Sequence, residues 1–207
     1  MKHIKSYNLF ENLETEMNFD KIVEVLSTEC SEFLTLLKEK NIKGLYRGAT
    51  IHDTPTIDGF WKMRPFTNRL SRDTKPQISK LLDEGFVNKF GIPLRSKGVF
   101  ATKDLSIAAD YGRFKKEAFL FFPKNGFRYF WNPVIDDLYT ELRDTYEFYY
   151  KDPFDWNSSE WRDFESIIDG YQEGEIEKVK WQELTFICDE YYMLDLDYYD
   201  KFLDYLF

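Results

Sequence analysis

The sequence predicts an α+β protein with a mostly antiparallel, split β-sheet and flanking helices. Helical patterns come first in the chain, and short strand patterns gather in its middle and at its end. The regular strand-helix-strand alternation of a parallel sheet is missing. The glycine patterns GxGxxG and GxxxxGK[ST] are also absent from the sequence, which excludes the two common phosphate-binding loops of parallel-sheet proteins.

The N-terminal part of the chain predicts one helix over residues 20–40, capped by Asn18 or Asp20. Apolar side chains recur there at helical spacing, namely Val23, Leu26, Cys30, Phe33 and Leu37. A short strand, Leu45-Tyr46, follows and ends at Arg47-Gly48. The segment 49–74 is polar and contains three helix or strand breakers, so we expect a long loop of functional type.

The middle of the chain predicts a helix from Pro76 to Gly91 and then a strand over 98–102. Asp104 is expected to cap a short helix that ends at Tyr111-Gly112. Two further apolar runs, 117–122 and 126–130, have the composition of paired strands.

The C-terminal half predicts a helix that opens at Asn132-Pro133 and another that opens at Ser158 or Ser159 and ends near Gly170. After an acidic loop, segments 183–188 and 191–194 read as strands, and an apolar stripe over 199–206 indicates a final helix. We expect one domain over 1–207, with an N-terminal helical segment (1–43), a core (44–194) and a C-terminal helix (195–207).

Composition excludes several classes of function. A net charge of -9 disfavours a protein that coats duplex DNA. Two cysteines, both in apolar stretches, indicate reduced buried thiols, and two histidines leave little material for a metal site, so we expect no metal. The N-terminus lacks a signal-peptide pattern, and no run approaches the ~18 apolar residues of a membrane span. We therefore expect a cytoplasmic protein without membrane contact.

Three polar residues stand on or beside predicted strands in the order Arg47, Thr102, Glu183. With Tyr46-Arg47-Gly48 on a first strand, 98–102 on a second and Glu183-Leu184-Thr185-Phe186 opening a third, the chain resembles the ADP-ribosyltransferases of the arginine–serine/threonine–glutamate class. The residues that carry the resemblance are spread over 45–194 and do not form one dense local motif. It implies a split β-sandwich that binds NAD in a central cleft within 44–194.

The chemistry of that class explains these residue types. A planar guanidinium such as Arg47 can clamp phosphate or ribose oxygens of NAD. Cleavage of the nicotinamide–ribose bond creates a positively charged sugar, which a carboxylate, here Glu183, would stabilise. Thr102 would bridge the carboxylate and the ribose. Gly48 completes the first motif, and Tyr46 and Tyr111 are candidates for the flat wall of the nicotinamide site.

The sequence departs from the family pattern at two places. The Ser-Thr-Ser motif of the class reads Ala101-Thr102-Lys103 here, and the Glu or Gln that often stands two residues before the catalytic glutamate is Trp181. An alternative catalytic carboxylate lies in Glu173-Gly174-Glu175, which has the Glu-x-Glu spacing but sits in a polar loop. We favour Glu183 because a strand start holds a carboxylate more rigidly.

Arginines in the segment after Arg47 form a second candidate feature. We expect these side chains either to fold over the NAD pyrophosphate or to form surface pairs with acidic residues; they are Arg64, Arg69 and Arg72. Arg95 and Lys97 would add to the positive electrostatic potential there.

The resemblance implies a mono-ADP-ribosyltransferase, of the compact kind found as toxins or phage–host conflict effectors. The acceptor would be a protein or a single-stranded nucleic acid, and a cognate antitoxin would be a further partner. Two alternatives stay open at this point, a non-catalytic binding or inhibitor protein and an NAD glycohydrolase.

Overall fold

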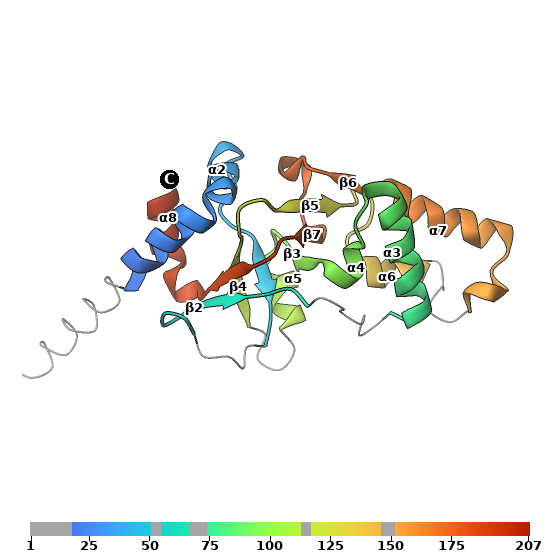
Figure 1. Ribbon diagram of the computed structural model, residues 1–207, viewed down its shortest axis with the longest axis horizontal. Helices are drawn as coiled ribbons and strands as arrows, with labels where there is room; N and C mark the ends of the chain where they lie inside the picture. The colour runs from blue at the N-terminus through green and yellow to red at the C-terminus, as the bar shows by residue number, and fades with distance from the viewer. Residues whose placement is uncertain (1–17, 51–54, 67–73, 113–116, 146–151) are drawn as a thin grey trace, which may run out of the picture.

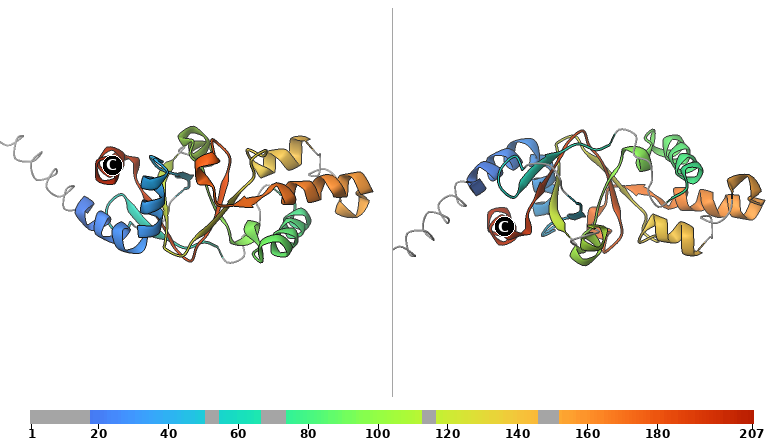
Figure 2. Two further views of the ribbon diagram at one scale, coloured as in Figure 1. Left: turned by 90° about the horizontal axis from the view of Figure 1, so that it is seen from above. Right: turned by 90° about the horizontal axis from the view of Figure 1, so that it is seen from below.

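The computed structural model describes residues 18–50, 55–66, 74–112, 117–145 and 152–207. It contains helices and two four-stranded antiparallel sheets, so the prediction of an α+β protein with antiparallel pairing is confirmed. Figures 1 and 2 show the strands in the middle of the molecule, with helices at both ends of the long axis.

The first sheet has the order β1-β4-β8-β2. Its strands are β1 (Tyr46–Gly48), β4 (Ala118–Pro123), β8 (Tyr191–Leu194) and β2 (Phe60–Met63). Every residue of β4 is buried, as its unbroken apolar sequence requires for a central strand. Strand β2 lies in the segment that the sequence predicted as a loop. That prediction was wrong here, because pairing with β8 orders Phe60 and Trp61.

The second sheet has the order β3-β7-β5-β6, with β3 (Val99–Ala101), β7 (Leu184–Ile187), β5 (Arg128–Trp131) and β6 (Gln172–Glu173). A bridge between Tyr46 and Thr102 joins the two sheets. The amide of Tyr46 donates to the carbonyl of Thr102 over 2.8 Å, and the amide of Thr102 donates back over 2.9 Å. The ends of β1 and β3 therefore meet, which brings two of the three predicted motifs together.

Helices cover the sheets from two ends (Figure 1). Residues 18–29, α2 (Ser31–Glu39) and α8 (Tyr199–Leu206) lie at one end, and α3 (Pro76–Phe90), α4 (Leu94–Lys97), α6 (Leu138–Thr140) and α7 (Ser158–Gly170) lie at the other. Helix α5 (Leu105–Tyr111) packs on β1. Shorter helical turns are Glu141–Thr145, Pro153–Asp155, Ile176–Lys178 and Leu196–Tyr198.

Two hydrophobic clusters fill the interior. The larger cluster contains residues of the first sheet, of the inner face of the second sheet and of the N- and C-terminal helices. Phe33 is at its centre. The ring centres of Phe121, Phe122 and Phe186 lie within 6.4 Å of that of Phe33. The smaller cluster contains residues of α3, α6 and α7 and of the opposite face of β5. The high aromatic content is thus mainly core material.

Two predicted helix starts were wrong. Asn18 and Asp20 lie inside the helix rather than at its cap, and this helix bends at Cys30 before α2 begins. No helix opens at Asn132, because its Oδ1 accepts hydrogen bonds from the amides of Val134 and Ile135 and so forms a local turn. Asp137 is the cap that starts α6.

Other local predictions are confirmed. Asp104 caps α5 by accepting from the amides of Ser106 and Ile107, and Gly91 ends α3 with a φ of 76°. Helix α7 begins at Ser158, with Asn157 as its cap and Glu160 completing a capping box. Cys30 and Cys188 are free thiols, and burial raises the pKa of each to about 12. Among the described residues no helix is long and apolar enough to cross a membrane.

Candidate functional site

Arg47 lies at the junction of the two sheets, with its guanidinium partly buried. Its Nη1 donates to the carbonyl of Phe100 on β3 over 2.7 Å, and its Cζ lies 5.6 Å from the ring centre of Tyr191 on β8. The Nε is buried and lacks a hydrogen-bond partner, and no ion pair joins Arg47 to any carboxylate in the part of the chain that the structure describes. A partly buried cation without a counter-charge is costly, so this position favours an anionic ligand.

The neighbours of Arg47 on β1 have packing roles. A Cβ on Gly48 would lie 1.9 Å from the carbonyl oxygen of Ala108, so glycine is what lets α5 approach β1. The ring of Tyr46 is buried in the larger core, 6.3 Å from that of Tyr199. Of the two tyrosines predicted to form a flat wall, only Tyr111 is substantially exposed, at 49%.

Thr102 is buried directly after β3. Its Oγ1 donates to the carbonyl of Trp181 over 3.2 Å and accepts from the amide of Asp104 over 3.2 Å. The pairing of Ala101 with Leu184 makes Thr102 and Glu183 the next residues along the two paired strands. The hydroxyl group therefore fixes the backbone just before Glu183, a positioning role that differs from the predicted direct bridge to the carboxylate.

Glu183 enters β7 from a fixed backbone position, because its amide donates to the carbonyl of Asp136 over 2.9 Å. Its Oε1 lies 3.6 Å from Nη1 of Arg95, and the two side chains are 12% and 11% exposed. Arg95 also lies over the ring of Phe100, at 4.8 Å, and its amide donates to Asp83 over 2.7 Å. The sequence suggested Arg95 only as part of a general basic field, since the Arg95–Glu183 pair joins positions far apart in the chain.

Tyrosines and aspartates surround this ion pair. The hydroxyl of Tyr111 donates to Oδ2 of Asp137 over 2.5 Å. Burial raises the pKa of Tyr111 and of fully buried Tyr171, and the nearby charge of Glu183 acts in the same direction on both. Glu183 is thus near three polar residues that come from different helices: Tyr111 on α5, Asp137 at the cap of α6 and Tyr171 at the end of α7. Asp137 was missed in the sequence because the helix was predicted to open at Asn132-Pro133, which placed Asp137 inside it rather than at its cap.

The segment 174–182 before β7 is held by side chains from the second sheet. The indole of Trp131 donates to the carbonyl of Gly174 over 2.8 Å. The ammonium of Lys103 donates to the carbonyls of Ile176 and Val179, over 2.7 and 2.8 Å, and burial lowers its pKa. Lys103, which departs from the family motif, is therefore a clamp on this segment.

The alternative carboxylates are already engaged in ion pairs. Glu173 forms two hydrogen bonds with Arg128, at 2.7 and 2.8 Å. Glu175 has a φ of 56° and lies 2.5 Å from Nζ of Lys178. Both are more than 40% exposed, unlike Glu183. The geometry favours Glu183 as the carboxylate of a protected site.

Arg64 makes a surface ion pair with Glu190, with Nε and Nη2 at 3.1 and 3.0 Å from Oε1. Its side chain is 80% exposed. This matches the second of the two interpretations of the arginine group, a surface pair. Arg69 and Arg72 lie outside the described residues.

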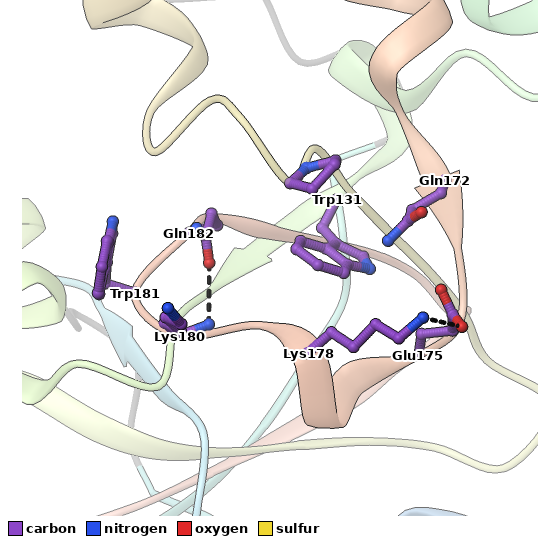
Figure 3. Close-up of a pocket in the computed structure, with 8 residues that line it drawn as sticks. Trp131, Gln172, Glu175, Lys178, Lys180, Trp181 and Gln182 are labelled. Atoms are coloured by element: carbon purple, nitrogen blue, oxygen red, sulfur yellow. Dashed lines mark hydrogen bonds and ion pairs between the residues drawn. The ribbon is translucent and has the colours of Figure 1, made fainter.

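An open pocket of about 470 Å³ lies beside the entrance to β7 (Figure 3). Its walls come from the end of β5, from β6 and from the segment before β7. The lining residues are Trp131, Pro133, Gln172, Glu175, Lys178, Lys180, Trp181 and Gln182. Gln182 directly precedes Glu183, so the pocket and the Arg95–Glu183 pair flank the same stretch of backbone.

Within the described ranges, no group of three or more histidine, cysteine, aspartate or glutamate side chains could hold a metal ion. No protein-family model, curated protein or solved structure matches the chain.

Proposed function

We propose that the chain is a mono-ADP-ribosyltransferase that transfers ADP-ribose from NAD to a macromolecular acceptor. The observation that carries the proposal is Arg47, a partly buried guanidinium without an ion-pair partner among the described residues. It stands where β1 meets β3, and β3 in turn pairs with the strand that Glu183 opens. A cation on β1 and a protected carboxylate before β7, joined through β3, suit a substrate that carries phosphates at one end and a ribose at the other.

Arg47 would bind the anionic part of NAD. One of its nitrogens is held by the carbonyl of Phe100, which fixes the plane of the guanidinium, and the buried Nε has no hydrogen-bond partner in the described part of the chain. Charge-assisted hydrogen bonds of this kind are about twice as strong as neutral ones. The residue would therefore act mainly in binding.

Glu183 would stabilise the positive charge that grows on the ribose as nicotinamide leaves. Low exposure strengthens that interaction, because water screens it poorly. Arg95 keeps a positive charge 3.6 Å from the carboxylate. Thr102 and Asp136 would hold in place the backbone that leads into Glu183.

Tyr111 supplies a half-exposed aromatic ring near Glu183, and its hydroxyl donates a hydrogen bond to Asp137. We assign it as the wall for the nicotinamide ring, because a tethered aromatic ring loses little freedom when a flat ligand stacks on it.

Incubation with labelled NAD and cell lysate tests the proposal. We expect release of nicotinamide and transfer of the label to a macromolecule. Glu183→Gln is expected to lower transfer at least 100-fold while NAD binding stays within a few-fold of wild type. Arg47→Ala is expected to weaken NAD binding at least tenfold.

Glu173→Gln is the matched control, since it makes the same chemical change at a more exposed glutamate on β6 that is not one of the pocket-lining residues. It is expected to leave transfer within a few-fold of wild type. Thermal unfolding of all variants separates loss of function from loss of fold. Absence of nicotinamide release by wild type with every extract would refute the proposal, and steady NAD loss without a labelled macromolecule would indicate a glycohydrolase instead.

A further inference from the structure

The pocket beside β7 contains amide groups that are free to bind a ligand. Gln182 is 6% exposed, and its Oε1 accepts from the backbone amide of Lys180 over 2.8 Å. The side-chain nitrogen of Gln182 has no hydrogen-bond partner in the described part of the chain. The same is true of the whole amide group of Gln172 on β6. Figure 3 shows both amides beside the indole of Trp131. An amide donor that opens into a cavity can bind a polar ligand.

Charged side chains that line the pocket are Glu175, Lys178 and Lys180. Glu175 and Lys178 neutralise each other at 2.5 Å, as the dashed line in Figure 3 marks. Lys180 is exposed, and within the described ranges it forms no ion pair with a carboxylate. Its Nζ lies 5.5 Å from the ring centre of Trp181. Lys180 therefore offers one positive charge to a negative group of a ligand.

Aromatic surface completes the pocket. Trp131, only 2% exposed, forms its floor, and Trp181, 45% exposed, stands at its edge. The indole nitrogen of Trp181 donates to Oδ1 of Asp136 over 2.6 Å, so the exposed ring is held in one orientation. A fixed exposed indole is a stacking surface for a flat ring, and bases of single strands bind proteins in this way.

We propose that this pocket receives one unstacked nucleobase and its phosphate from a single-stranded nucleic acid. Trp181 would stack on the base, the amides of Gln172 and Gln182 would bind its polar edge, and Lys180 would pair with the phosphate. The volume of about 470 Å³ is within the usual range for small-molecule sites. The proposal rests on the proposed function in one respect: it makes a single-stranded nucleic acid, rather than a protein, the acceptor of ADP-ribose.

Binding of short mixed-sequence, dye-labelled single-stranded DNA and RNA oligonucleotides, measured by fluorescence anisotropy without NAD and by competition with unlabelled ligands, tests the pocket. One phosphate contact predicts a slope of about -0.7 in a plot of log affinity against log salt concentration. Lys180→Gln is expected to bring that slope close to zero. Trp181→Ala is expected to weaken binding by about 5- to 150-fold, since stacking on one base contributes about 1–3 kcal/mol.

Lys80→Gln is the matched control, because Lys80 is an exposed lysine on α3 that pairs only with Glu84 among the described residues. It should keep the wild-type affinity and salt slope. No binding of either oligonucleotide, or equal losses in Lys80→Gln and Lys180→Gln, would overturn the proposal. Equally tight binding of free mononucleotides or of NAD at Trp181 would also overturn it, in favour of a small-nucleotide pocket. Because this assay contains no NAD turnover, its result stands apart from the nicotinamide-release test of the proposed function.

Discussion

Glu190, in the turn between β7 and β8, allows a quantitative test of how the first sheet is held together. Its carboxylate lies 2.9 Å from Nζ of Lys62 and 3.2 Å from Nζ of Lys124, and it also binds Arg64. Hydrogen bonds from Lys62, Arg64 and Lys124 lower the pKa of Glu190 from 4.5 to about 2. The turn leads directly into Tyr191, which lies under Arg47, so this cluster also supports the candidate site.

We expect Glu190→Gln to lower the free energy of unfolding at pH 7 by about 1–2 kcal/mol. The difference between the two pKa values corresponds to at most about 3 kcal/mol. Solvent screening reduces that figure, because the side chains of Lys62, Lys124 and Arg64 are 35%, 37% and 80% exposed.

The stabilisation that Glu190 contributes depends on pH. The pKa of Glu190 is lower in the folded chain than in the unfolded one, so its stabilisation is complete above about pH 4.5. It is lost as the pH falls from there through about 2. The gap in unfolding free energy between wild type and Glu190→Gln should therefore shrink with acidification.

Urea unfolding of both proteins between pH 7 and pH 3 measures this gap. Glu84→Gln serves as the control, because Glu84 forms one exposed pair on α3, at 3.7 Å, and should change stability by less than about 0.5 kcal/mol. The reasoning fails if Glu190→Gln is as stable as wild type at pH 7, or if its deficit stays constant down to pH 3.

Two substitutions test the packing of the site itself. Gly48→Ala is expected to cost about 3 kcal/mol or more in thermal or urea unfolding, because the new Cβ would lie 1.9 Å from the carbonyl oxygen of Ala108. Gly126→Ala, at a φ of 83° in open space, should cost only about 1–2 kcal/mol, and equal costs would contradict this account. Lys103→Met removes two hydrogen bonds to the segment before β7, so amide hydrogen exchange in 175–180 should become faster while exchange in β4 stays unchanged. Unaltered exchange in 175–180 would show that Lys103 is not the clamp.

Patterns that depend on local chemistry could be predicted from the sequence. The helix from Pro76 to Gly91 has a proline at its first turn and a left-handed glycine at its end, and the structure places both there. Asp104 was predicted as a cap for the same kind of reason. The strand segments were predicted from apolar composition, except for β2 and β6. These two strands are ordered by pairing with β8 and β5, which are distant in the chain.

The sequence by itself determined the α+β class, the strand ends that carry Arg47 and Thr102, and the order of those residues with Glu183. These properties follow from periodicity, composition and caps, which act over a few residues. Only the tertiary structure decided which side chains meet. It placed Arg95 against Glu183, tied Thr102 to the carbonyl of Trp181, and left Arg47 without a carboxylate partner in the described part of the chain. Contacts of this kind join residues tens of positions apart, and they depend on how two sheets and their helices pack, which no local pattern records.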